Sequence, residues 1–197
     1  SIMEKTSSVF VALVGRPNVG KSSLTNRLVG EKVAIVTSKP QTTRTRITGI
    51  ITRGPVQYVL LDTPGIHKPR TKLGERMSKT ATSSIGDVDV TLMLFEPYGE
   101  LNEAELGLVA DIRASHGPAV AVINKTDTLK AKTDLAVRAA QLKELGVFDQ
   151  VRAISVRKDE GCEDLFEVLA GYAAEGPHYF PDDAYTDMPE KALVSEV

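Results

Sequence analysis

The sequence predicts a three-layer α/β domain with about six strands in a mainly parallel sheet. Two observations support this prediction. Short apolar runs alternate with segments of helical length and periodicity, which requires crossover connections between parallel strands that are covered on both faces. Residues 47–52 and 56–61 are instead joined by the tight turn Arg53-Gly54-Pro55 and predict one antiparallel hairpin. The 197 residues, 42% of them hydrophobic, suffice for one domain with its own core.

The elements follow in order along the chain. The run VFVALV at residues 9–14 is typical of a strand buried on both faces. Leu24, Leu28 and Val29 then recur at helical spacing, and Gly30 is the expected end of that helix. Further strands are expected over residues 47–52, 56–61, 88–95, 119–123 and 151–155. Helical patterns cover about residues 72–84, 102–115, 132–145 and 163–172.

We expect this domain to span residues 1–176. From Gly176 the chain reads GPHYFPDDAYTDMPEKALVSEV, with three prolines and with aromatic residues that show no periodicity, as in a linker. Pro189 then has the place of the first residue of a new helix. Residues 177–197 are therefore interpreted as an interdomain linker and the start of a truncated second domain. The alternative is a frayed C-terminal helix that packs on the first domain.

Composition excludes several classes of protein. No run approaches the ~18 consecutive apolar residues of a membrane helix, and the first ten residues do not resemble a signal peptide. The sequence therefore favours a soluble, cytoplasmic protein. A single cysteine, Cys162, excludes an internal disulfide, and three widely spaced histidines provide no zinc-type cluster.

Charge is unevenly distributed, although the net charge is only −2. Residues 31–80 carry ten basic and three acidic side chains, whereas residues 81–197 carry ten basic and twenty-two acidic ones. The basic middle segment suits contact with a polyanion, and a solvated basic loop is the alternative interpretation. The acidic C-terminal part argues against a protein that binds nucleic acid over its whole surface.

Gly15, Gly20, Lys21 and Ser22 complete the pattern G-x-x-x-x-G-K-S between the first strand and the first helix. In this setting the backbone N–H groups of residues 18–22 converge on phosphate oxygens at a helix N-terminus, where the helix dipole favours anions. Lys21 is expected to reach the β and γ phosphates of a nucleotide, and the Ser22 hydroxyl to ligate Mg²⁺. The alternative, a glycine turn with an exposed lysine, is disfavoured by the flanking strand and helix.

The stretch DTPG follows the strand VQYVLL. A carboxylate at the carboxyl end of a buried strand lies beside the phosphate loop, so Asp62 is expected to hold Mg²⁺ through water. Gly65 offers an N–H to the γ-phosphate without a side chain in the way. Taken alone, DTPG is equally compatible with a turn that merely ends a strand.

The stretch NKTD, with Asn124, Lys125 and Asp127, follows the strand AVAVI. A fixed carboxylate accepts two hydrogen bonds from N1–H and the 2-amino group of guanine, and adenine offers no such pair of donors. Asn124 either binds N7 of the base or braces the phosphate loop, and the Lys125 stem lies over the base plane. After the last strand, Ser155 and Val156 offer a hydroxyl and a backbone N–H to the base carbonyl.

These four elements, each at the carboxyl end of a strand, define a GTPase domain. GRPNVGKSSLTNRLVG, KPQTTRTRITGI, LLDTPGIHKP, VINKTD and GPHYFPDDAYTDMPE together resemble the Era family of bacterial ribosome-assembly GTPases, from about residue 9 to 197. The resemblance implies a Ras-like P-loop GTPase domain that binds GTP or GDP with Mg²⁺. It also implies a following KH domain, missing here, that binds 16S ribosomal RNA of the small ribosomal subunit, and peripheral association with the membrane in the family. PHYFP matches the interdomain linker of that family.

The motifs and the resemblance together give the expected nucleotide-binding residues. They are Gly15, Arg16, Pro17, Asn18, Val19, Gly20, Lys21, Ser22, Ser23, Asp62, Gly65, Asn124, Lys125, Asp127, Ser155 and Val156. The family usually has Ser-Ala in its last motif, whereas this chain has Ser155-Val156, which should preserve backbone recognition with slightly looser binding of guanine.

The resemblance also makes residues 41–45 (QTTRT) the first switch, in which Thr43, chosen over Thr42, closes on Mg²⁺. Local sequence alone is equally compatible with a polar loop there. Mg²⁺ is thus assigned to Ser22, Thr43 and Asp62. Catalysis is assigned to Lys21, Asn18, Thr43 and Gly65.

The position after DxxG predicts slow hydrolysis. Ras-type enzymes have a glutamine there that orients the attacking water, and this chain has Ile66, whose alkyl side chain cannot bind water. His67 is a weaker candidate for a base. Family relatives with an asparagine like Asn18 use it to hold K⁺ near the β and γ phosphates, with a shaping role in the loop as the alternative.

Two other functions compete with that of a regulatory GTPase. The absence of a glutamine at Ile66 suggests a nucleotide-dependent binding module with negligible turnover. A P-loop kinase is disfavoured because NKTD selects guanine rather than adenine. In a switch protein, the γ-phosphate orders residues near 36–48 and 62–84, and hydrolysis releases them.

Overall fold

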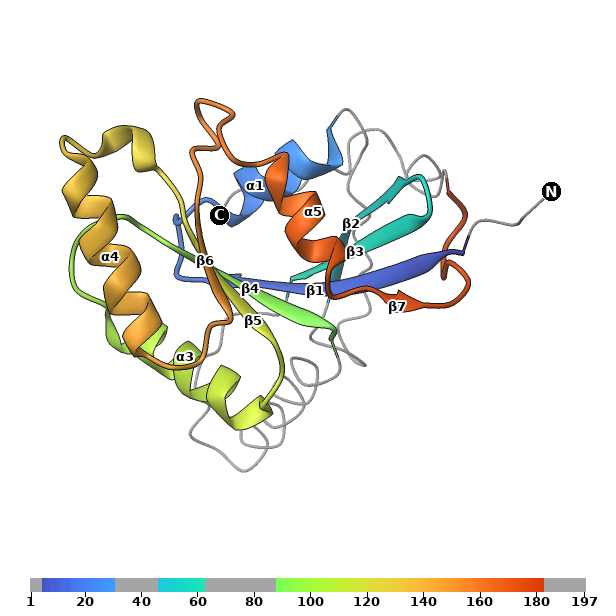
Figure 1. Ribbon diagram of the computed structural model, residues 1–197, viewed down its shortest axis with the longest axis horizontal. Helices are drawn as coiled ribbons and strands as arrows, with labels where there is room; N and C mark the ends of the chain where they lie inside the picture. Colours follow the sequence, from blue (N-terminus) through green and yellow to red (C-terminus); the bar gives the residue numbers. More distant parts are fainter. Residues whose placement is uncertain (1–4, 31–45, 63–87, 183–197) are drawn as a thin grey trace.

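The computed structural model describes residues 5–30, 46–62 and 88–182 (Figure 1). Within these ranges, seven strands form one sheet with the order β2-β3-β1-β4-β5-β6, and β7 pairs with β1. The strands are β1 (Ser7–Gly15), β2 (Arg46–Arg53), β3 (Val56–Asp62), β4 (Val90–Phe95), β5 (Ala119–Ile123), β6 (Gln150–Ala153) and β7 (Ala174–Glu175). The helices are α1 (Lys21–Val29), α3 (Glu103–Ser115), the 3-10 turn η1 (Thr126–Thr128), α4 (Lys132–Glu144) and α5 (Asp164–Ala170).

The sheet is mainly parallel, as the sequence predicts. β1 pairs in parallel with β3 and β4, and β4, β5 and β6 continue the parallel ladder. β2 runs antiparallel to β3, which confirms the predicted hairpin. β7 adds a short antiparallel pair to Ser7 and Ser8, on the stretch of β1 that β4 does not reach because β4 begins its pairing at Val11. A strand of two residues is too short to leave a pattern in the sequence.

Helices cover both faces of this sheet and complete the three layers (Figure 1). On one face, Leu24 of α1 and Leu165 of α5 pack against Val11 and Leu60 in one buried cluster. On the other face, side chains of α3 and α4 pack against β4 and β5 in a second cluster. The apolar strands therefore bury both of their faces, which is why they appear in the sequence as continuous apolar runs.

The helix boundaries agree with the sequence to within a few residues. Asn102 caps α3, because its side chain accepts a hydrogen bond from Glu105 N (2.8 Å) while the Glu105 carboxylate accepts one from Asn102 N (3.0 Å). The helix predicted over residues 72–84 lies outside the described residues. None of the described helices has both the length and the apolar character needed to cross a membrane.

Residues 176–182 pack on the end of the sheet at which β1 and β3 begin. The side chain of Gln57, which is fully buried, accepts hydrogen bonds from the backbone N–H groups of Tyr179 and Phe180, both at 3.1 Å. Its amide nitrogen donates to Phe180 O (2.9 Å) and to the Thr52 hydroxyl (3.0 Å). The two donors and two acceptor sites of this amide are thus all used, three of them by the incoming segment.

Aromatic and imidazole contacts reinforce this packing. The Tyr179 ring meets the Phe10 ring edge to face, with 4.9 Å between centroids. His178 lies between two oxygen acceptors, with Nε2 2.8 Å from Pro55 O and Nδ1 2.9 Å from the Asp182 carboxylate.

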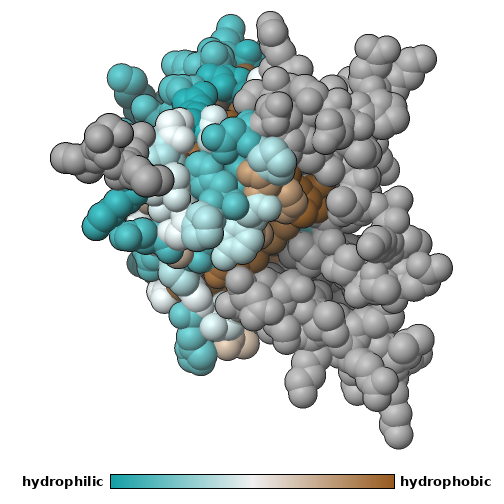
Figure 2. Space-filling view, turned by 90° about the vertical axis from the view of Figure 1, so that its right-hand side faces the viewer, coloured by the Kyte–Doolittle hydropathy of each residue, from teal (hydrophilic) through white to brown (hydrophobic). Residues whose placement is uncertain are grey.

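Figure 2 views the molecule from this end, where hydrophilic residues cover much of the described surface and border a band of hydrophobic ones. The segment interpreted as a linker is therefore docked on the domain as far as residue 182. The domain boundary at residue 176 stays a prediction.

Candidate nucleotide-binding site

The loops that carry the predicted motifs meet at the carboxyl end of the parallel strands. A pocket of about 450 Å³ opens there between the loop after β1, the loop after β5 and the loop after β6. It is lined by Asn18, Gly20, Ser23, Asn124, Lys125, Asp127, Thr128, Val156 and Arg157. Thr128 and Arg157 were not among the residues expected from the sequence. A pocket at this edge of an open α/β sheet is the usual place for a ligand.

The loop after β1 has a backbone that depends on its glycines. Gly20 has φ 108°, and a Cβ atom placed on it would lie 2.4 Å from Asn124 Nδ2. A Cβ on Gly15 would lie 2.9 Å from Val19 Cγ1. Asn18, exposed on the same loop, adopts the left-handed conformation with φ 65°, which asparagine tolerates better than most residues. The backbone of this loop therefore comes close to its neighbours at Gly15 and Gly20, where a side chain would clash.

The first turn of α1 follows this loop directly. Lys21 begins the helix, Ser22 and Ser23 complete its first turn, and Leu24 N donates to Gly20 O at 2.9 Å. Gly20, the N-cap residue, has no side chain that could cap the helix, and the positive end of the helix dipole faces the loop. This placement suits a bound phosphate.

Asn124 joins two of the loops. The residue is 3% exposed, its Nδ2 donates to Val19 O at 3.1 Å, and its Oδ1 accepts from Val156 N at 3.2 Å. Of the two roles that the sequence left open, bracing of the phosphate loop is the one for which the structure shows a contact. The Val156 N–H, expected to bind the base carbonyl, is here a donor to Asn124.

The carboxylate of Asp127 is held by the loop after β6. Ser155, which is fully buried, donates from Oγ to Asp127 Oδ1 at 2.8 Å and accepts from Lys158 N at 3.1 Å. The neighbouring Thr126 donates from its hydroxyl to Ile154 O at 2.9 Å. Ser155 thus orients Asp127, while its predicted direct contact with the base stays a prediction.

Lys125 reaches across to the phosphate loop. Its Nζ donates to Asn18 O at 3.0 Å and to the Glu96 carboxylate at 3.3 Å, and Glu96 also pairs with Arg16 at 3.0 Å. Burial of the Glu96 carboxyl disfavours its charged form, but the hydrogen bonds from Arg16 and Lys125 outweigh burial and lower its pKa. Sequence reasoning missed Glu96, although a single acidic residue directly after an apolar strand was a signal for it.

The residues assigned to Mg²⁺ lie partly within the described ranges. Asp62 ends β3 and stands opposite Leu13 of β1 in the ladder, and Ser22 lies in the first turn of α1. A carboxylate and a hydroxyl are oxygen ligands of the kind that Mg²⁺ accepts, and this ion is commonly held by one or two carboxylates together with substrate phosphates. The donor set therefore fits the ion. Thr43 and Gly65 lie outside the described residues, as do Ile66 and His67.

Comparison with known sequences places the chain among GTPases. The sequence profile of a family described as 50S ribosome-binding GTPase matches residues 10–125. GTPase Era of Clostridioides difficile is 43% identical over 190 residues, which cover 96% of this chain and 64% of that protein. GTPase Era of Geotalea uraniireducens is 44% identical over 191 residues with the same coverage. The chain thus spans less than two thirds of the length of these relatives.

Solved structures of Era and of a FeoB G domain are also similar to this chain. A variant of Aquifex aeolicus Era bound to GDP and AlF4⁻ is similar to this chain with a TM-score of 0.75 and 32% identity, over 93% of this chain and 63% of that one. Era in complex with MgGDPNP and nucleotides 1506–1542 of 16S ribosomal RNA gives the same values. The G domain of the T. maritima FeoB iron transporter has a TM-score of 0.62 and 25% identity, over 84% of this chain and 98% of that one.

Proposed function

Because this chain belongs to the 50S ribosome-binding GTPase family and, within it, to the Era GTPases, we propose that it binds and hydrolyses GTP as a molecular switch. The observation that supports this proposal most directly is the pocket itself, in which Asn124 ties the phosphate loop to the loop that orients Asp127. Phosphate-binding and base-binding parts are therefore built into one site.

Guanine is the base that suits this pocket. The Asp127 carboxylate, oriented by Ser155, accepts hydrogen bonds from N1–H and the 2-amino group of guanine. Adenine has no donor at the equivalent of N1, so a carboxylate facing it would lose hydrogen bonds to water without replacing them. The stem of Lys125, whose amine is anchored on Asn18 O, covers one face of the base.

Phosphate binding and hydrolysis are assigned to the first loop and to the two switches. Lys21 would contact the β and γ phosphates, Gly65 would donate its N–H to the γ-phosphate, and Asn18 would hold a K⁺ ion. Ser22, Asp62 and Thr43 would hold Mg²⁺, which would supply positive charge to the phosphate oxygens.

Turnover is proposed to be slow, because Ile66 stands where Ras-type enzymes use glutamine to orient water. Measurement of phosphate release over many turnovers, with GTP, Mg²⁺ and K⁺, tests the proposal. ATP in place of GTP is the control for base recognition. Binding of GTP with no phosphate release above that of the Lys21→Ala variant would support the alternative, a binding module without turnover. Release that depends on an added phosphate acceptor would support a kinase.

The intact protein is proposed to act in the maturation of 16S ribosomal RNA and assembly of the small ribosomal subunit. The support is similarity to Era, for which a complex with 16S ribosomal RNA is known, although the family description names the 50S particle. RNA binding is assigned to a KH domain outside this chain. A cytoplasmic location, with peripheral contact to the inner face of the cell membrane, belongs to the same proposal.

Electrophoretic shift with 16S ribosomal RNA tests the assignment of RNA binding. This chain should fail to bind the RNA specifically at physiological salt, because residues 81–197 carry an excess of acidic side chains that repel a phosphate backbone. A protein extended by the following domain should bind it. Tight, sequence-dependent binding by this chain alone would place RNA recognition in the GTPase domain.

A further inference from the structure

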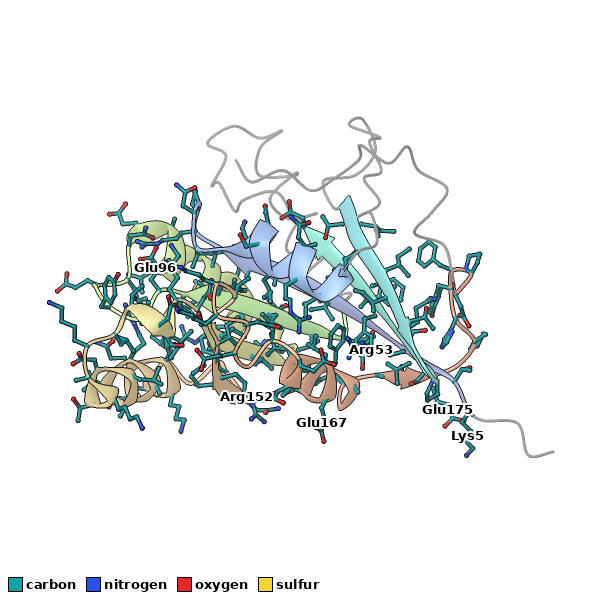
Figure 3. The ribbon with its side chains drawn as sticks, turned by 90° about the horizontal axis from the view of Figure 1, so that it is seen from above. Lys5, Arg53, Glu96, Arg152, Glu167 and Glu175 are labelled. Atoms are coloured by element: carbon teal, nitrogen blue, oxygen red, sulfur yellow. The ribbon has the colours of Figure 1, made fainter. Side chains whose placement is uncertain are left out.

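Glu96 occupies a central position among the loops of the site. It follows β4 directly, and β4 lies between β1 and β5 in the sheet. The phosphate loop follows β1 and the NKTD loop follows β5, so Glu96 emerges between them. Figure 3 labels Glu96 at this end of the sheet, with Lys5 and Glu175 at the opposite end.

The carboxylate of Glu96 contacts a cation from each neighbouring loop. Oε1 lies 3.0 Å from Arg16 Nη2 and 3.3 Å from Lys125 Nζ. The Glu96 side chain is 19% exposed, whereas those of Arg16 and Lys125 are 29% and 39% exposed. The anion is thus the best shielded of the three groups, and both cations turn toward it.

Removal of this anion would change the position of both loops. Lys125 adopts the left-handed conformation with φ 60°, and its amine also donates to Asn18 O. Without Glu96, the like charges of Arg16 and Lys125 would face each other and repel. Lys125 would then lose the contact that helps to hold its stem beside the pocket.

We propose that Glu96 is a positioning residue for guanine nucleotide binding, whose carboxylate fixes the phosphate loop and the NKTD loop relative to each other before the nucleotide arrives. This inference rests on the proposed function. Pre-organisation of a site raises affinity by lowering the cost of ordering it on binding. Loss of Glu96 should therefore speed up nucleotide dissociation.

The test is the affinity and dissociation rate of a fluorescent GDP for Glu96→Gln. We expect binding to weaken about tenfold, at the lower end of what a hydrogen bond between charged groups contributes, because the side chains are partly exposed. Glu100→Gln is the matched control, since Glu100 is an exposed glutamate on the same loop. Glu96→Asp keeps the charge on a shorter side chain and should lie between Glu96→Gln and wild type.

A double-mutant cycle separates positioning from a general structural role. If Glu96 acts through the two cations, Glu96→Gln should cost less than about twofold in affinity when introduced into Arg16→Met/Lys125→Met. Equal losses in both backgrounds would overturn the inference, as would a Glu96→Gln variant that binds GDP like Glu100→Gln. Failure of the wild-type chain to bind GDP at all would instead contradict the proposed function.

Discussion

The hydroxyl of Ser155 donates a hydrogen bond to the Asp127 carboxylate, with 2.8 Å between Oγ and Oδ1. Ser155 is fully buried and follows β6, whereas Asp127 lies on the turn after β5. Two loops from neighbouring strands thus fix the direction of one carboxylate.

Base specificity should therefore change with Asp127→Asn. The asparagine amide presents a donor where guanine also has a donor, so GTP should lose two charge-assisted hydrogen bonds at a cost on the order of 3 kcal/mol, about a hundredfold in affinity. Xanthosine triphosphate, which has a carbonyl in place of the 2-amino group, should bind better than GTP. Competition titration measures both. Ser155→Ala, which leaves the carboxylate but removes its orienting bond, should cost only about fivefold. Unchanged GTP affinity in Asp127→Asn would refute the assignment.

Substitutions at the neighbouring residues Lys21 and Ser22 should affect phosphate binding and metal binding separately. Lys21→Ala should abolish tight nucleotide binding, because the lysine ammonium neutralises the β and γ phosphates. Ser22→Ala should mainly remove the dependence of binding on Mg²⁺. Isothermal titration with GDP, with and without Mg²⁺, distinguishes these effects. A Ser22→Ala protein with the Mg²⁺ dependence of wild type would show that the hydroxyl does not ligate the ion.

Hydrolysis should be faster in K⁺ than in Na⁺, and this difference should vanish without the Asn18 side chain. Asn18→Gly is the suitable variant, because glycine adopts the observed φ of 65° without strain whereas alanine does not. Its backbone carbonyl can still accept from Lys125, so GDP affinity should stay within about threefold of wild type. Phosphate release in the two salts is the measurement. Equal rates for the wild-type chain would exclude the cation role.

Gly20→Ala should disrupt the site far more than another glycine substitution at positive φ. The new Cβ would lie 2.4 Å from Asn124 Nδ2, so the amide that braces the phosphate loop must move. Nucleotide affinity should fall at least tenfold, since strain at such a position costs about 1–3 kcal/mol and the brace is lost as well. Gly54→Ala, at φ 55° in the hairpin turn with no atom within 4 Å of the new Cβ, should cost about 1 kcal/mol of unfolding free energy and leave GDP binding intact. Similar GDP affinities for the two variants would contradict this account.

Docking of residues 176–182 should weaken as pH rises. Both ring nitrogens of His178 face oxygen acceptors, and only the imidazolium donates from both. The hydrogen bond to Asp182, followed by that to Pro55 O, raises the pKa of His178. A raised folded-state pKa means that the stabilisation is complete below the unfolded value of about 6.5 and is lost as pH rises through the folded value.

The difference in unfolding free energy between wild type and His178→Gln, followed by urea denaturation across pH, measures this stabilisation. It should be largest at low pH and decline above neutrality. Asp182→Asn should reduce the pH-dependent part, because the largest cause of the pKa shift is removed. A difference that does not vary with pH would mean that His178 docks as the neutral ring.

Much of the fold and the site was predictable because the relevant signals are local. Apolar runs set β1, β4 and β5, and Gly54 set the hairpin turn, since period and turn chemistry act over a few residues. What the sequence could not show depends on sheet order. Glu96 links two motifs only because β4 lies between β1 and β5, and sequence spacing does not contain that order.

Buried polar contacts were the other limit of sequence reasoning. Gln57 interrupts an apolar strand and reads as a minor exception, yet its partners lie more than 120 residues away at Tyr179 and Phe180. Asn124 had two chemically reasonable roles, and only the distances to Val19 and Val156 favour one of them. A side-chain amide has the same hydrogen-bonding capacity in every fold, so its partners cannot be read from its own position.

The amide of Gln57 also keeps residues 177–182 from serving as a flexible tether, because its hydrogen bonds to Tyr179 and Phe180 hold this segment on the sheet. Six extended residues would add about 20 Å of reach. A shorter tether confines an attached module to a smaller volume and raises its effective concentration near the domain. Residues 177–182 lie at the end of the sheet at which β1 and β3 begin, opposite the end that carries the nucleotide pocket.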